Sequence, residues 1–267
     1  MTAAASTARA QLTTLREHAR QMDTGNFAVS TDLNTFMGEV HSSGYAFFQP
    51  TVGTAFRLYE AVFEAALPFA YFHENNDPGA DHNQFALGNP WFALSFLPDT
   101  QCGLSRLSLG IAPDLVRAKD ARDRMANTLA RAATGDWDGY LWLDHTLPLV
   151  FGASTRKERG MWRIGWDADL VLGLPGNGRQ TEFGAQTAGE FALLFGWDVS
   201  LGTRLSAAYY PTFDGDTFQS ALTTYLRYAR INDAFGARFV LNLDGPAGFS
   251  FSDNGIWGAA LFYSTSL

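Results

Sequence analysis

Between Met161 and Leu174 the chain reads MWRIGWDADLVLGL, and large apolar residues alternate there with charged or small ones. The even positions are Trp162, Ile164, Trp166, Ala168, Leu170, Leu172 and Leu174. Successive side chains of a strand point to opposite faces, so the pattern predicts a strand with one apolar and one charged face. An ordinary strand has about five or six residues, whereas a tilted strand needs ~9–11 residues to cross a bilayer. This stretch is long enough to do so.

The same alternation recurs from Phe27 to the end of the chain, in about twelve segments joined by alternating tight turns and mostly longer loops. An even number of strands, with short turns at one end and long loops at the other, is typical of bacterial outer-membrane barrels. The sequence therefore predicts an all-β, antiparallel up-and-down transmembrane β-barrel at residues 25–267. Residues 1–24 are expected to be a periplasmic tail or a short helix, or alternatively a plug or partner contact.

Three features favour lipid, rather than a soluble sandwich core, against the apolar face. The strands are too long for a sandwich, and the opposite face combines arginine and carboxylate with glycine, serine and threonine. Aromatic residues gather near strand ends, as in the interfacial girdles of membrane barrels: Tyr59, Tyr71, Trp162, Tyr209, Tyr228 and Trp257. We expect an outer-membrane protein with both termini in the periplasm.

The composition argues against several other classes of protein. The net charge is −8, and no basic stripe is present, which argues against a nucleic-acid partner. No run of eighteen apolar residues occurs, so a transmembrane helix is not expected. The single cysteine, Cys102, excludes an intramolecular disulfide.

Several connections carry specific expectations. A polar loop is expected at His73–Gly88, and a polar turn at Thr155–Gly160. The longest connection, Pro113–Gly139, is expected to be an extracellular loop with a short amphipathic helix capped by Asp114, accessible near Ala130. A strand is expected at Tyr140–Ser154, where His145 interrupts the outward face; a bulge turning it inward and a protein partner there are both open.

The last strand adds a resemblance to a known family. Trp257, Ala259, Leu261, Tyr263 and Leu267 share one face, and the final residue is hydrophobic. This resembles the C-terminal assembly signal of bacterial outer-membrane β-barrel proteins, which are porin-like in architecture. The family usually has a terminal Phe or Trp and an apolar residue where this chain has Thr265. The resemblance implies recognition by the barrel-assembly machinery and contact with outer-membrane lipid and lipopolysaccharide.

Parity along the strands predicts which charges face the lumen. The expected carboxylates are Asp32, Glu64, Asp144, Asp167, Asp169, Glu182, Glu190 and Asp244. The expected arginines are Arg57, Arg106, Arg163, Arg204, Arg227 and Arg238. Unpaired charges away from water are costly, so we expect arginine–carboxylate networks that narrow the passage. The slight carboxylate excess predicts a weak cation preference.

Two groups of residues have side chains that could carry chemistry. His41 and Ser43 could serve as base and nucleophile, since two known outer-membrane lipid hydrolases use a His-x-Ser pair, but an ordinary polar loop is the simpler interpretation. Five residues of one loop could supply ligands to Ca²⁺, although a solvated acidic loop is again simpler: His73, Glu74, Asp77, Asp81 and His82. We expect neither an enzyme nor a cofactor.

The expected function is a small diffusion channel or transporter for small polar solutes. The alternative is a structural barrel that anchors a multi-protein envelope complex, such as a motility or trafficking machine. Its contact surfaces would be the N-terminal segment, His145 and the outward Thr187, Gly189 and Thr203.

Overall fold

The computed structural model describes residues 25–40, 43–75, 82–98, 105–115, 130, 139–143, 145–176, 181–195, 198–211, 218–230, 233–243 and 256–266. In chain order its elements are β1 (Phe27–Val40), β2 (Ser43–Leu58), β3 (Ala61–Asn75), β4 (His82–Leu87), β5 (Trp91–Phe96), β6 (Arg106–Ile111), the 3-10 helix η2 (Gly139–Trp142), β7 (Thr146–Arg159), β8 (Trp162–Pro175), β9 (Glu182–Phe195), β10 (Val199–Tyr209), β11 (Phe218–Ala229), β12 (Asp233–Asn242) and β13 (Ile256–Ser266).

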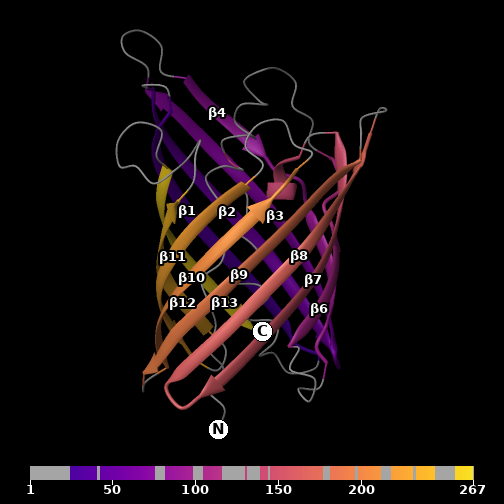
Figure 1. Cartoon of the computed structure of the whole chain (residues 1–267), viewed down its shortest axis with the longest axis vertical. Helices are drawn as coiled ribbons and strands as arrows, with labels where there is room; N and C mark the ends of the chain where they lie inside the picture. Colours follow the sequence, from indigo (N-terminus) through magenta and orange to yellow (C-terminus); the bar gives the residue numbers. More distant parts are fainter. Residues whose placement is uncertain are drawn as a thin grey trace.

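These strands form one closed antiparallel barrel (Figure 1). β1 pairs with β13, which joins the two ends of the sheet. β3 pairs with β4 along Phe69–Glu74 and with β5 along Ala61–Ala66. β4 and β5 are therefore two parts of one interrupted strand, and the thirteen strand segments occupy twelve positions around the barrel. The predicted closed barrel of about twelve strands is confirmed.

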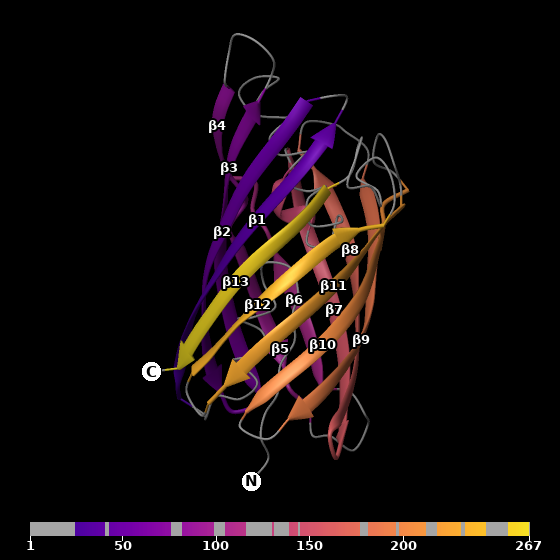
Figure 2. The same cartoon turned by 90° about the vertical axis from the view of Figure 1, so that its left-hand side faces the viewer.

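The first and last strands begin and end at the same end of the barrel. Ala28 near the start of β1 pairs with Ser266 at the end of β13, and Figure 2 shows the arrow of β13 ending there. The tight turns at Tyr59–Glu60 and Gly160–Met161 belong to this end as well. The barrel therefore has a turn end, where β1 begins and β13 ends, and an opposite loop end.

The two faces of the wall have opposite chemistry. On β8 the inward Arg163, Asp167 and Asp169 are at most 2% exposed, whereas the outward Ile164 and Leu170 are 61% and 53% exposed. The exposed large apolar side chains recur on every long strand and surround the barrel. Such a surface matches hydrocarbon outside, which is the reverse of a water-soluble core.

Glycines make room for large side chains on the inner face. A Cβ on Gly110 of β6 would overlap the ring of Trp91 on β5, and one on Gly202 of β10 would overlap the ring of Tyr225 on β11. Each aromatic ring therefore lies over the glycine of the neighbouring strand, in the space that a side chain would otherwise occupy.

Two predicted connections are wrong in extent. The loop expected at His73–Gly88 is largely strand, because β3 continues to Asn75 and β4 begins at His82. The turn expected at Thr155–Gly160 is also mostly strand, since β7 runs to Arg159 and the chain turns at Gly160, where φ is +60°. The cause is the hairpin register, in which Trp162 pairs with Arg159 and Pro175 with Thr146.

The strand expected at Tyr140–Ser154 begins six residues later, at Thr146. Tyr140, Leu141 and Trp142 lie on η2 or its end and are at most 4% exposed. His145 has a φ of +56° and precedes the strand, so it does not interrupt the lipid face. Because His145 is not on the lipid-facing side of the strand, its polarity needs neither a bulge within the strand nor a partner at that surface.

The helical extracellular loop expected at Pro113–Gly139 is not established. In the described parts of the chain, helical backbone is found at η2 and at Ala130, and no helix there is long and apolar enough to cross a membrane. The predicted accessibility does not hold at Ala130 itself, which is fully buried. Its carbonyl oxygen accepts a 2.9 Å hydrogen bond from Nε2 of Gln49 on the inner face of β2.

Candidate functional site in the barrel interior

The structure describes twelve of the fourteen residues that were predicted to face the lumen. Ten are at most 4% exposed: Asp32, Glu64, Arg106, Arg163, Asp167, Asp169, Glu190, Arg204, Arg227 and Arg238. Arg57 and Glu182 are half-buried. Asp144 and Asp244 lie outside the described residues.

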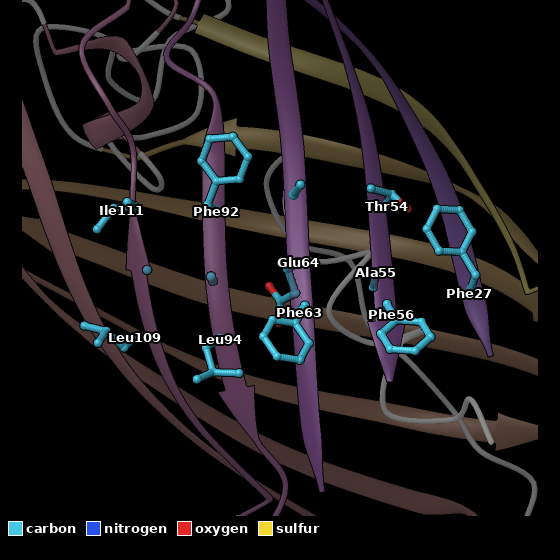
Figure 3. A pocket seen from close by; sticks show the side chains of 13 residues that line it. Phe27, Thr54, Ala55, Phe56, Phe63, Glu64, Phe92, Leu94, Leu109 and Ile111 are labelled. Atoms are coloured by element: carbon cyan, nitrogen blue, oxygen red, sulfur yellow. The ribbon is translucent and has the colours of Figure 1, made fainter. Parts of the chain in front are cut away.

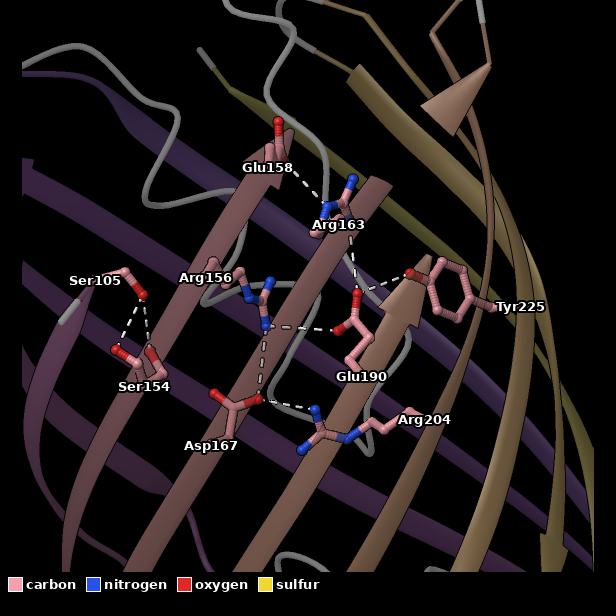
Figure 4. A network of polar contacts seen from close by, with 9 residues as sticks. All are labelled: Ser105, Ser154, Arg156, Glu158, Arg163, Asp167, Glu190, Arg204 and Tyr225. Atoms are coloured by element: carbon pink, nitrogen blue, oxygen red, sulfur yellow. Dashed lines mark hydrogen bonds and ion pairs between the residues drawn. The ribbon is translucent and has the colours of Figure 1, made fainter. Parts of the chain in front are cut away.

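One wall of the barrel, from β7 to β10, carries a connected network of these charges (Figure 4). Asp167 of β8 accepts a hydrogen bond from Nη1 of Arg204 at 2.8 Å, and its Oδ2 also lies 3.6 Å from Nη2 of Arg156. The same Nη2 of Arg156 lies 3.8 Å from Oε2 of Glu190. Arg156 therefore joins two carboxylates on neighbouring strands.

Glu190 of β9 is the centre of the other half of the network. Its Oε1 accepts a 2.9 Å hydrogen bond from the Tyr225 hydroxyl and lies 3.7 Å from Nη1 of Arg163. The Arg163 and Glu190 side chains are both fully buried. Arg163 also donates from Nε to Glu158 at 3.1 Å, a carboxylate whose side chain is 38% exposed.

Small residues explain why these long side chains can meet. Gly165 pairs with Arg156 on one side and with Glu190 on the other. A Cβ on Gly165 would lie 3.4 Å from Nε of Arg156, an ordinary contact distance, so the guanidinium lies directly over this position of β8. The requirement is stricter at Gly202, where a Cβ would overlap the Tyr225 side chain that crosses β10 to reach Glu190.

Two smaller groups lie elsewhere on the inner wall. Glu64 accepts a 2.5 Å hydrogen bond from Ser95 and lies 3.9 Å from Nη1 of Arg106. Arg238 donates to Oδ1 of Asn34 at 2.6 Å and lies 3.4 Å from Oδ1 of Asp32. Charged side chains are thus paired around the lumen, and the clustering is densest on β7–β10.

Sequence reasoning missed Arg156, which had been assigned to a turn. Its side chain is 11% exposed and lies on the inner wall. With it, the described inner positions hold seven arginines, against six of the eight predicted carboxylates and Glu158, which shares the face of Arg156 on β7 and contacts Arg163. The predicted excess of carboxylates is therefore not present in the described part of the lumen.

The loop end of the interior is aromatic. Trp91 and Tyr140 lie with ring centroids 5.2 Å apart, and both are at most 1% exposed. Trp142 and Tyr210 belong to the same buried cluster, and the Tyr210 hydroxyl is hydrogen bonded to Gln186. No pattern in the sequence predicts this cluster.

The interruption between β4 and β5 holds η2 inside the barrel. The Asn89 backbone N–H donates to the Leu141 carbonyl at 2.7 Å, and its Nδ2 donates to the Leu143 carbonyl at 2.7 Å. Asn89 is 2% exposed. Breaking the strand at this point lets one residue bind two carbonyls of the inward segment.

Replacing Asn89 with alanine is expected to destabilise the barrel by about 1–3 kcal/mol, because the buried Leu143 carbonyl loses its donor. Urea unfolding in lipid vesicles, followed by tryptophan fluorescence, measures the change. Asn89→Asp keeps the shape but removes the side-chain donor, so it should be at least as damaging. A fully stable Asn89→Asp variant would show that this hydrogen bond does not hold η2.

The remaining candidate residues are only partly described. His41, Asp77 and Asp81 lie outside the described residues. Ser43 begins β2, His73 and Glu74 lie on β3, and His82 begins β4, which makes this segment a hairpin. No group of three or more potential metal-binding side chains occurs among the described residues.

The comparisons support the fold. Protein-family models and curated proteins gave no match to this sequence. A solved outer membrane channel from Pseudomonas putida F1 aligns with a TM-score of 0.59 at 9% identity, over 92% of this chain and 97% of that chain. The beta domain of the Bordetella autotransporter Brka aligns with a TM-score of 0.50 at 12% identity, over 92% of this chain and all of that chain (100%).

These findings define the class of protein. The chain has the fold of bacterial outer-membrane β-barrels, with twelve strand positions. Within that class it is similar in structure to a channel and to an autotransporter domain. At these identities the likeness concerns the fold alone.

Proposed function

We propose that this barrel is a narrow channel for small polar solutes, with the network of β7–β10 as its constriction and both termini on the periplasmic side. The supporting observation is that Arg163, Arg204, Asp167 and Glu190 are buried, paired and at most 4% exposed on the inner wall. Burying ion pairs is costly, and inward ionisable residues in membrane proteins mark solute pathways. A barrel that served only as an anchor could fill its interior with apolar side chains.

The network offers a solute alternating fixed charges. Guanidinium groups and carboxylates on adjacent strands provide donors and acceptors that can replace water around a polar solute. Because positive and negative side chains are nearly balanced, we expect weak ion selectivity. This differs from the weak cation preference that the slight excess of predicted carboxylates indicates.

The test is conductance in a planar bilayer. The wild-type protein should give small steps with little selectivity, because paired side chains occupy much of the lumen. Replacing both Arg163 and Arg204 with serine should raise the conductance and shift the reversal potential towards cation selectivity, since Asp167 and Glu190 each lose a cationic partner. The shift is measured under a salt gradient.

Arg159→Ser provides the control, because Arg159 is exposed at the last position of β7. It should leave conductance and selectivity unchanged. A wild-type channel with large conductance and anion selectivity would contradict the proposed constriction. Absence of conductance in every form would favour the alternative function.

The alternative is an anchor for other envelope proteins. Thr187, Gly189 and Thr203 are exposed on the outer face of β9 and β10, and a Cβ on Gly189 would meet no atom within 4 Å. Small residues on a lipid-facing surface permit close approach of another membrane segment. Co-purification of partners in fixed ratio, without conductance, would support this function.

A further inference from the structure

A groove of about 510 Å³ lies on the outer surface of the barrel, across β1, β2, β3, β5 and β6 (Figure 3). Large apolar side chains line it: Phe27, Phe56, Phe63, Phe92, Leu94, Leu109 and Ile111. All but Ile111 are 38–50% exposed, on the face that meets the membrane. The groove is therefore open to lipid and separate from the lumen.

The hairpin register accounts for the groove. Thr54 and Ala65 pair with each other on β2 and β3, and two residues further towards the turn Phe56 pairs with Phe63. A small pair beside a pair of phenylalanines leaves a depression on an otherwise bulky surface. Phe92 on β5, which pairs with Ala65, borders it on the next strand.

The groove offers no polar group that needs a partner. The Thr54 hydroxyl already donates to the Ala28 carbonyl at 3.0 Å. Glu64, which also borders the groove, directs its carboxylate to Ser95 and Arg106 on the inner wall. Hydrocarbon therefore suits this surface better than a polar chain, because it leaves no hydrogen bond unmade.

We propose that the groove binds one acyl chain of a phospholipid, whose headgroup lies at the adjacent Tyr59–Glu60 turn. From Thr54 to Tyr59 the strand rises about 17 Å at ~3.4 Å per residue, which an acyl chain can span. Tyr59 is 74% exposed there, at the turn that ends the outward face of β2. An exposed aromatic residue at the membrane interface is typical of the level at which lipid headgroups lie.

The choice of phospholipid rests on the orientation given under the proposed function. The groove lies in the half of the barrel nearest the turn end, which that orientation places in the periplasmic leaflet. The binding of an acyl chain does not depend on whether the lumen conducts. The two proposals therefore fail separately.

The test is native mass spectrometry of the protein after reconstitution with phosphatidylglycerol and transfer into detergent. The wild-type protein should retain one phosphatidylglycerol. Ala65→Phe fills the groove, so retention should fall to background. Ala168→Phe, at another half-exposed alanine on the outer face of β8, is the matched control and should retain the lipid.

Heat-dependent mobility on gels establishes that both variants fold as barrels. Equal retention by the wild type and Ala65→Phe would overturn the proposal. So would exclusive retention of lipopolysaccharide from native membranes, or a wild-type dimer that Ala65→Phe dissociates. Conductance should be the same in all three forms, because none of the changes faces the lumen.

Discussion

Replacing Glu190 with alanine is expected to destabilise the folded barrel by about 3–5 kcal/mol, the cost of removing one partner from a buried ion pair. The substitution leaves the fully buried Arg163 without its buried carboxylate and removes the acceptor of the Tyr225 hydroxyl. Arg156 would retain Asp167, at 3.6 Å. The loss is measured as a change in the free energy of unfolding, from urea titrations in lipid vesicles.

Glu158→Ala is the matched control, because Glu158 contacts the same arginine at 3.1 Å but has a side chain that is 38% exposed. Because water reaches Glu158, and Arg163 keeps Glu190, this variant should lose clearly less stability than Glu190→Ala. Equal losses from the two substitutions would mean that water reaches Glu190 as freely as Glu158. The buried constriction would then be wrong.

The parts of the fold that the sequence predicted are those in which one face of a strand is apolar and the other is not. On β8, alternation alone assigned Arg163, Asp167 and Asp169 to the inner wall, where the structure places them. A shift of one residue would turn every side chain to the wrong face, so the register is strongly specified. The closed barrel follows from repeating this pattern around the wall.

Arg156 was missed because a run of charges resembles a solvated turn. The sequence STRKERG, residues 154–160, has no apolar side chain to mark an outward face. The information that could have placed it was the length of the neighbouring strand. A β-hairpin with a tight turn pairs residue for residue, so the fourteen residues of β8 require fourteen in β7.

The buried aromatic cluster at the loop end was missed because its residues lie in an apolar run, whereas Arg156 lies in a charged one. Residues 140–143 read YLWL, a continuous apolar run that cannot distinguish a buried strand from another buried element. Their burial depends on Asn89, which lies more than fifty residues earlier and binds two of their carbonyls. No local pattern encodes such a contact.

The outer face can be tested against the membrane itself. Replacing Leu170 with arginine should cost about 2–4 kcal/mol, because a charged side chain near the bilayer midplane must leave water. Leu170 lies near the middle of the apolar face of β8 and is 53% exposed in the isolated chain. In a water-soluble protein a side chain so exposed could become arginine with little effect, usually within about 0.5 kcal/mol. The size of the loss therefore reports hydrocarbon on this face rather than packing.

The measurement is urea unfolding of the barrel in phospholipid vesicles, with Leu170→Met as the apolar control at the same position. Leu170→Met should change the free energy of unfolding by less than about 1.5 kcal/mol, since volume and polarity are nearly conserved. Asp169→Asn, on the opposite face, keeps the shape of a side chain that is 2% exposed and should also cost less than Leu170→Arg. If arginine at 170 were as well tolerated as methionine, water rather than lipid would surround β8, and the outward assignment of its apolar face would be wrong.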